Sequence, residues 1–150
     1  MSPIEYCAEE VYRQGHNIKD LDGIQRVSWM LAGWSYALRN QSRSFHFDDI
    51  VFLGKAIEPN KNQGGLRKCG VRVGSRICPD WENVPELLHR LLKYGTELSP
   101  LEFYKEFELI HPFVDGNGRT GKVLLNWRNG SLLDPIFPPN DLWGYPILNP

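Results

Sequence analysis

The sequence predicts an all-α domain that carries one small β-hairpin, and two observations lead to this prediction. Apolar residues recur at helical spacing over most of the chain, as Ile24, Val27 and Leu31 do. Residues 58–80 follow a different pattern, in which glycines and prolines separate short, partly alternating runs. The chain has 150 residues, of which 41% are hydrophobic, so it can bury one core, and we expect residues 1–150 to form a single domain.

The N-terminal third is predicted to hold two helices. A short helix spans Ile4–Arg13 and ends near Gly15. A longer helix spans Leu21–Leu38, and the acidic residues Asp20 and Asp22 lie near its start, where negative charge complements the helix dipole.

A third helix and a hairpin follow. Asp48 and Asp49 start the helix, which we expect to run over Ile50–Ile57 and to stop before Pro59. In the next stretch, the runs 66–68 and 71–73 predict a small β-hairpin, or flap, with Cys69 and Gly70 near its turn. An irregular loop is the alternative.

Two strong signals place the fourth and fifth helices. Trp81–Tyr94 is amphipathic. Ser99 and Pro100 then form a typical helix start, in which Ser caps the helix and Pro takes its first position. This fifth helix is expected to end near His111, because Pro112 disfavours helical geometry in the residue before it.

The last helix is predicted to follow a tight turn at residues 116–118 and to reach about Arg128, where Asn129 and Gly130 end it. The segment 130–150 is rich in proline and is expected to be an irregular strap.

Charge and cysteine content narrow the choice of function. The net charge is −1, with 17 basic and 18 acidic residues, so no overall field attracts nucleic acid or an anionic membrane. The flap is basic but lacks aromatic residues on which bases could stack, so we expect a solvated hairpin. Three cysteines fit a reducing compartment better than a disulfide framework. With no secretory signal and no long apolar segment, we expect a cytoplasmic protein.

The run 111–122 reads His-Pro-Phe-Val-Asp-Gly-Asn-Gly-Arg-Thr-Gly-Lys and carries the chemistry. Gly116 and Gly118 allow the backbone to approach a ligand closely, and the helix that follows presents free amides to an anion. Arg119 and Lys122 lie three residues apart on that helix, so both can face the same phosphates.

The same run supplies an acid and a base. Asp115 next to bound phosphates implies an intervening cation, and Mg²⁺ binds through one or two carboxylates together with phosphates. His111 has the side chain in this run whose ordinary pKa is nearest neutrality, as a general base requires. Together these residues predict phosphoryl or nucleotidyl transfer to a hydroxyl. The structural alternative is a packing histidine and an aspartate that caps a turn.

A phosphate-loop reading of Gly116, Gly121 and Lys122 is weak. Val123 stands where that pattern needs a hydroxyl for Mg²⁺, and the short, proline-rich segment that follows leaves no room for further strand–helix units.

Residues 111–122 resemble the signature of the Fic family (His-x-Phe-x-Asp/Glu-Gly-Asn-Gly-Arg-x-x-Arg) at every position except the last. The segment 65–74 is similar to the family's flap, and 98–101 is similar to the start of the helix that leads into the signature. The resemblance covers about residues 48–128, with N-terminal helices in 1–47 and the irregular tail outside it.

The resemblance implies an all-α Fic-type bundle with a β-hairpin flap, and a protein adenylyltransferase that moves AMP from ATP to a Ser, Thr or Tyr hydroxyl of a target protein with Mg²⁺. His111 would be the base and Asp115 the metal ligand. Gly116, Asn117 and Gly118 would form the anion hole, Arg119 would bind the β-phosphate, and Lys122 would take the place of an arginine that binds the γ-phosphate. The flap would bind the target; its residues are Leu66, Arg67, Lys68 and Val71.

Lys122 departs from the signature, because lysine keeps the charge of arginine but loses its planar fork. The family also contains kinases and members that transfer other groups, and a catalytically lapsed Fic domain that acts as a binding module is a further alternative.

In inhibited members of the family a regulatory glutamate, in the motif Ser/Thr-x-x-x-Glu-Gly/Asn, pairs with the last arginine of the signature. Glu82-Asn83 is the nearest match here, but Cys78 stands where the motif needs Ser or Thr. We therefore expect no self-inhibitory helix. Three alternatives stay open: a separate antitoxin supplies the glutamate to a toxin-like enzyme, the enzyme is uninhibited, or Lys122 makes inhibition unnecessary.

Overall fold

The computed structural model describes residues 1–142, which form six α-helices, two 3-10 turns and one two-stranded antiparallel hairpin. The predicted all-α fold with a small hairpin is confirmed. The elements are α1 (Pro3–Arg13), α2 (Leu21–Arg39), α3 (Phe47–Ile57), β1 (Arg72–Val73), β2 (Arg76–Ile77), η1 (Trp81–Asn83), α4 (Val84–Tyr94), η2 (Gly95–Glu97), α5 (Pro100–Ile110) and α6 (Asn117–Asn129).

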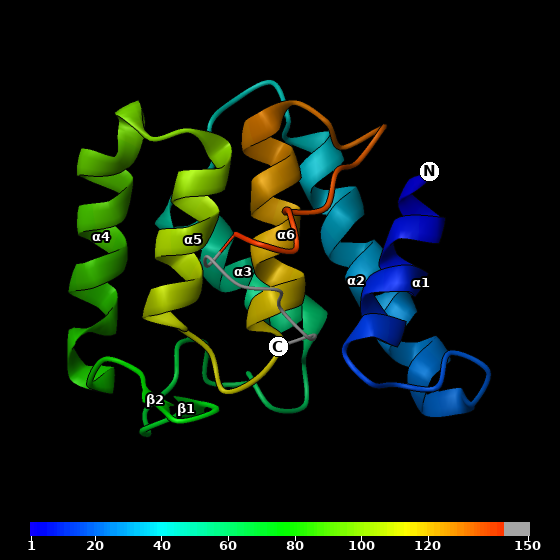
Figure 1. Ribbon diagram of the computed structural model, residues 1–150, viewed down its shortest axis with the longest axis horizontal. Helices are drawn as coiled ribbons and strands as arrows, with labels where there is room; N and C mark the ends of the chain where they lie inside the picture. The colour runs from blue at the N-terminus through cyan, green and yellow to red at the C-terminus, as the bar shows by residue number, and fades with distance from the viewer. Residues whose placement is uncertain (143–150) are drawn as a thin grey trace.

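Helix α6 lies at the centre of the bundle (Figure 1). It packs against α5, α2 and α3, while α4 lies outside α5 and α1 lies outside α2. Every residue from Arg119 to Trp127 is buried, the polar ones included. Because buried polar groups must find partners, the neighbours of α6 have to supply them.

The predicted helix starts are confirmed by their capping contacts. Ser99 accepts a hydrogen bond from the Glu102 amide, and Glu102 returns one to Ser99. Asp20 caps α2 by accepting from the Gly23 amide. Helix α3 begins one residue before the predicted aspartates, and Asp49 accepts from the His46 amide.

The hairpin exists, but its predicted position was wrong. Its strands are Arg72–Val73 and Arg76–Ile77, and Gly74, with φ of 59°, lies in the turn in place of Cys69 and Gly70. The run 66–68 is not a strand. The Arg67 amide donates instead to the carbonyl of Pro112 at 3.0 Å, so this run is tied to the loop that precedes α6.

Two other segments differ in detail from the prediction. The first three residues of the predicted helix Trp81–Tyr94 form the 3-10 turn η1, and Pro85 lies in the first turn of α4. The tail is irregular, as predicted, up to residue 142. It crosses α1, where the Tyr6 hydroxyl donates to the carbonyl of Ile136 at 2.7 Å. The remainder of the predicted strap, residues 143–150, lies outside the described residues.

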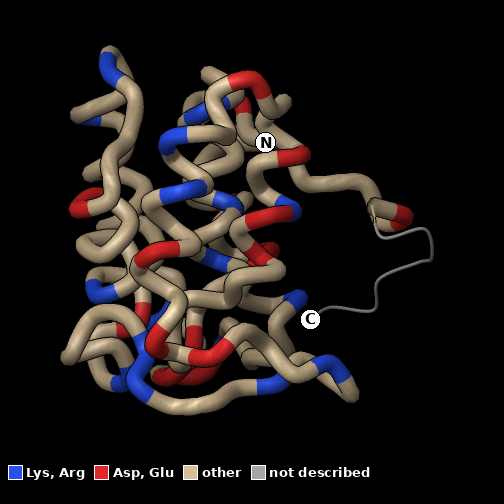
Figure 2. Tube along the Cα trace, turned by 90° about the vertical axis from the view of Figure 1, so that its left-hand side faces the viewer, with Lys and Arg blue, Asp and Glu red and all other residues tan. Residues whose placement is uncertain are grey.

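Charges of both signs are interspersed along the chain (Figure 2), which agrees with the absence of an overall field. Cys7, Cys69 and Cys78 are all free. No helix within residues 1–142 has both the length and the apolar character that a membrane crossing requires.

Candidate functional site

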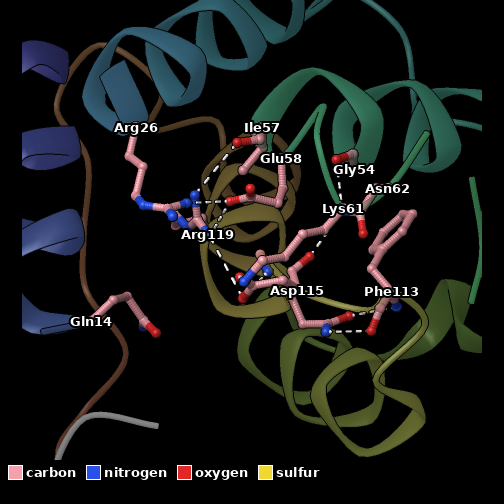
Figure 3. A network of polar contacts seen from close by, with 12 residues as sticks. Gln14, Arg26, Gly54, Ile57, Glu58, Lys61, Asn62, Phe113, Asp115 and Arg119 are labelled. Carbon is pink, nitrogen blue, oxygen red and sulfur yellow. Dashed lines mark hydrogen bonds and ion pairs between the residues drawn. The ribbon is translucent and has the colours of Figure 1, made fainter. Parts of the chain in front are cut away.

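The loop between α5 and α6 is held by a side chain from α6. The Asn117 Oδ1 atom accepts from the Phe113 amide at 2.8 Å, and Asn117 Nδ2 donates to the Phe113 carbonyl at 2.9 Å (Figure 3). Phe113 is fully buried and packs so closely on α3 that a Cβ atom at Gly54 would lie 2.2 Å from its ring. The Asn117 side chain thus shapes the loop, and only its amide can serve a bound anion.

The start of α6 offers open backbone amides. Its N-cap is Gly116, with φ of 75°, so no side chain of the capping residue closes the helix end. A side chain at Gly116 would be strained and would press on the Cβ atom of Glu58 at 3.3 Å. A Cβ atom at Gly118 would lie 3.1 Å from Nε2 of Gln14 on the far side. The start of α6 therefore has the open backbone that the predicted anion cradle needs, and Gln14 at the end of α1 lies against it.

Asp115 lies next to this cradle, with both carboxylate oxygens engaged. Oδ1 accepts from the Gly116 amide at 2.8 Å, and Oδ2 accepts from Lys61 Nζ at 3.0 Å (Figure 3). Burial raises the pKa of Asp115, but the Lys61 hydrogen bond, the Gly116 amide and the nearby Arg119 outweigh it and leave the pKa lowered. The result is an ionised carboxylate that already holds one cation.

The Asp115 carboxylate suits a metal ion that takes most of its other ligands from nucleotide phosphates and water. Within residues 1–142 no three His, Cys, Asp or Glu side chains gather as a metal cage. Mg²⁺ does not need one, because it binds through one or two carboxylates plus phosphates and keeps several waters. The half-buried Asp115 fits that mode once Lys61, whose side chain is 53% exposed, moves aside.

Arg119 points away from solvent toward a buried carboxylate. Its Nη2 atom lies 3.0 Å from Oε2 of Glu58, and the same oxygen accepts from Arg26 Nη1 at 2.6 Å (Figure 3). Arg119 Nη1 also donates to the carbonyl of Ile57 at 3.4 Å. Two guanidinium groups thus share one carboxylate. Arg26 also pairs with Asp22 at 3.2 Å and Arg119 lies 3.7 Å from Asp115, so the charges of this cluster are largely balanced.

Lys122 is buried and paired with a residue of α1. Its Nζ atom lies 3.0 Å from Oε2 of Glu10, and it donates to the Tyr104 hydroxyl at 3.3 Å. The same Glu10 oxygen accepts from Gln14 Nε2 at 2.8 Å. We expected no self-inhibitory helix in this chain, because its nearest motif match lacks the Ser or Thr. The structure nevertheless places a glutamate of α1 on the last cation of the signature. Glu10 does not match the inhibitory motif, because Tyr6 stands where the motif has Ser or Thr, and Val11 stands where it has Gly or Asn.

His111 ends α5 in a left-handed conformation with φ of 52°. Burial, with the cations of Arg76 and Arg67 beside it, lowers the pKa of His111 to about 4, although the carbonyl of Glu108 and the charge of Asp115 act in the opposite direction. The Nδ1 atom is buried and has no hydrogen-bond partner within residues 1–142. The imidazole is therefore neutral near pH 7 and able to accept a proton.

Arg67 was predicted to belong to the target-binding flap, but its side chain is not available at the surface. Its side chain is buried and donates to four backbone carbonyls: His111 at 2.7 Å, Cys69 at 3.0 Å, Pro79 at 2.6 Å and Ile110 at 3.2 Å. It therefore fastens the flap segment to the end of α5. Of the other residues predicted to bind a target, Lys68 is exposed, and Leu66 and Val71 are half-buried.

Several site residues were not predicted from the sequence: Glu10, Arg26, Glu58 and Lys61. Each meets its partner from a distant part of the chain, and none belongs to a spacing pattern that could have indicated it. His16, to which no role was assigned, lies near enough to Arg26 and Arg119 for their charges to help burial lower its pKa.

The pattern of the Fic/DOC family matches residues 44–128 of this chain. The chain is 31% identical over 120 residues to the protein adenylyltransferase Fic of Nematostella vectensis; the matched region covers 68% of this chain and 26% of that protein. It is 33% identical over 72 residues to the protein adenylyltransferase Fic of Drosophila persimilis, covering 42% and 14%. It is 27% identical over 133 residues to a probable protein adenylyltransferase of Aquifex aeolicus, covering 79% and 34%. The chain thus matches about a third or less of the length of each relative.

Proposed function

The chain belongs to the Fic/DOC family, and from this membership we propose that it transfers AMP from ATP to a Ser, Thr or Tyr hydroxyl of a target protein. The observation that carries the proposal is the pairing of an open helix end at Gly116 with a neutral imidazole at His111, one short loop apart. The first binds phosphates, and the second accepts a proton.

His111 removes the proton of the target hydroxyl as its oxygen attacks the α-phosphorus of ATP. A bond forms between that oxygen and the α-phosphorus, the bond from the α-phosphorus to the bridging oxygen breaks, and pyrophosphate leaves with the electron pair. Mg²⁺ held at Asp115 supplies charge neutralisation for the phosphates when bound. The amides of Asn117 and Gly118 and the cation of Arg119 fix the polyphosphate, while the Gly116 amide holds the Asp115 carboxylate.

The flap positions the target. The exposed hairpin and the adjoining residues Leu66, Lys68 and Val71 offer backbone groups with which an extended segment can pair as an added strand. The free thiols of the chain suit a reducing compartment such as the cytoplasm.

Glu10 restrains the enzyme from within the same chain. Its carboxylate binds Lys122, the cation that the γ-phosphate needs, and its partner Gln14 lies against Gly118. The γ-phosphate of ATP can reach Lys122 only after the Glu10 carboxylate moves away, because it is unfavourable for two anions to share one buried ammonium group. The resting form is therefore inhibited, and a separate antitoxin is not needed to supply the glutamate.

Labelled ATP distinguishes the candidate functions. The protein is incubated with Mg²⁺, cell lysate and ATP labelled on the α- or, separately, the γ-phosphate. Label on protein from the α-phosphate alone supports AMP transfer, whereas label from the γ-phosphate alone indicates a kinase. If neither label is transferred, even by a variant without the Glu10 carboxylate, the chain is a lapsed domain that acts as a binding module.

Two variants test the assigned roles. His111→Ala should abolish transfer and leave ATP affinity nearly unchanged, because the imidazole serves the chemical step. Gly116→Glu should abolish ATP binding, because its side chain is strained at positive φ and adds a negative charge to the cradle. Transfer by His111→Ala at the wild-type rate would rule out the base assigned here.

A further inference from the structure

The C-terminal end of α5 is capped by two arginines of the flap segment. A helix leaves its last four carbonyls without helical partners. Here Arg76 Nη1 donates to the Leu109 carbonyl at 3.1 Å and Nη2 to the Glu108 carbonyl at 3.4 Å. Arg67 donates to the carbonyls of Ile110 and His111. All four terminal carbonyls of α5 therefore accept from guanidinium groups, which also complement the negative end of the helix dipole.

The two arginines differ in how firmly they are held. Arg67 is buried and makes four side-chain hydrogen bonds. Arg76 is half-buried, makes only two side-chain hydrogen bonds, at 3.1 and 3.4 Å, and belongs to β2, one strand of the hairpin (Figure 1). Because a two-stranded hairpin is marginally stable by itself, Arg76 is the member of the pair that can shift when the flap shifts.

The charges of both guanidinium groups act on the His111 side chain. His111 directly follows the last turn of α5, which the arginines cap, so the cap fixes the backbone position from which the His111 side chain extends. The charged and polar groups that face it are Arg76 of β2, Arg67 of the preceding segment, Asp115 of the following loop and the carbonyl of Glu108 on α5. Of the two neighbouring cations, Arg76 has the larger influence in lowering the pKa of His111.

We propose that Arg76 is a positioning residue that couples the flap to His111. A peptide strand that pairs with the hairpin moves β2, and Arg76 moves with it relative to the end of α5. Withdrawal of this cation makes the imidazole a stronger base at the time when a target hydroxyl is present. The proposal rests on the proposed roles of His111 as base and of the flap as target-binding element.

The first test measures His111 directly in the full-length protein without nucleotide. The ring C–H signals of His111 are followed by NMR against pH and assigned by their loss in His111→Ala; the other histidines serve as internal references. Arg76→Gln should decrease the proton dissociation constant of His111 by about three- to ten-fold, since one nearby cation is removed. Arg76→Lys should restore most of the wild-type value. The control, Arg72→Gln on the exposed part of β1, should leave it unchanged.

The second test asks whether the hairpin acts through Arg76. Gly74 has φ of 59° in the turn, so Gly74→Val strains the hairpin, and no atom lies within 4 Å of the added Cβ atom. It should shift the His111 titration in the same direction as Arg76→Gln and add nothing in the Arg76→Gln background. Gly70→Val, at a glycine with open space and no positive φ, is the control. If Gly74→Val fails to fold, Gly74→Ala provides the same comparison with less strain.

The outcomes separate this inference from the proposed function. An unchanged titration in Arg76→Gln, or fully additive effects of Gly74→Val and Arg76→Gln, overturns the coupling even if the wild type transfers AMP. A shifted titration in a protein that transfers nothing, even after the Glu10 carboxylate is removed by Glu10→Gln, overturns the proposed function and leaves the influence of Arg76 on the imidazole in place. In an active protein, Arg76→Gln should change kcat at saturating ATP and leave the KM for ATP nearly unchanged.

Discussion

Lys122 is paired in a way that explains how a lysine can replace an arginine in this signature. Its ammonium lies between Glu10 and the Tyr104 hydroxyl, and the side chains of both Lys122 and Glu10 are nearly fully buried. A compact point charge needs only these few acceptors, whereas the fork of an arginine would present five donors in the same space. The substitution therefore fits the resting form of the chain.

Glu10→Gln should raise the rate of AMP transfer about ten-fold or more, because the neutral amide no longer competes with phosphate for Lys122. The same change should lower the free energy of unfolding by about 2–4 kcal/mol, since it leaves a buried ammonium without its counter-charge. Transfer assays and urea unfolding measure the two effects. Glu9→Gln is the matched control, because Glu9 pairs with Arg13 at the surface. Equal rates for the two variants would contradict the inhibitory role of Glu10.

Lys61→Met should strengthen divalent metal binding by about three- to ten-fold. Lys61 places an ammonium 3.0 Å from Asp115 Oδ2, and a metal at that oxygen has to displace it. Titration of Mn²⁺, followed by the loss of its free EPR signal in the presence of ATP, measures the change. Lys55→Met, at an exposed position of α3, is the control. Weaker metal binding by Lys61→Met would mean that Lys61 assists the loaded site and does not compete for it.

Helices and their caps could be predicted from the sequence, because their signals are local. Ser99 and Glu102 lie three residues apart and satisfy each other wherever the rest of the chain goes. The hairpin was misplaced because Arg67 is engaged by carbonyls of Ile110 and His111, more than 40 residues away. No local alternation of side chains carries that information.

The approach of α3 to the signature loop depends on a glycine. Gly54→Ala should lower the free energy of unfolding by about 1–3 kcal/mol, although alanine favours helix by about 1 kcal/mol, because the new methyl group would overlap the Phe113 ring. It should also weaken ATP binding, since Phe113 anchors the loop that Asn117 holds.

Thermal unfolding and ATP titration measure both effects of Gly54→Ala. Gly70→Ala adds the same methyl group where no atom lies within 4 Å and should leave stability and affinity unchanged. A Gly54→Ala protein as stable as the wild type would show that α3 and the loop can separate freely.

The bundle encloses a charge cluster contributed by three helices. Lys122 of α6 pairs with Glu10 of α1, and Glu108 of α5 lies near enough for the charges of both to act on it. The signature predicted a cation at position 122. Nothing in the sequence predicted that Glu10 would pair with it or that Glu108 would lie nearby, because the residues come from segments that meet only when the whole bundle forms. This is the part of the site that required the complete fold.

Glu108 makes this cluster sensitive to pH. Burial, helped by the charge of Glu10 and opposed by the charges of Lys122 and Arg76, raises the pKa of Glu108 to about 7. One of its oxygens, Oε1, is buried without a hydrogen-bond partner within residues 1–142. A carboxyl whose pKa is higher in the folded state than in the unfolded state binds its proton more tightly when folded. It therefore destabilises the fold progressively as pH rises from about 4.5 toward 7, and by a constant amount above that.

Glu108→Gln should consequently stabilise the protein by about 2 kcal/mol at pH 8.5 and by little at pH 4.5, because the amide resembles the protonated acid. Urea unfolding at a series of pH values measures the difference. Glu106→Gln, at an exposed position on the same helix, should change stability equally little at every pH. A stabilisation that does not grow with pH would show that Glu108 stays ionised in the bundle.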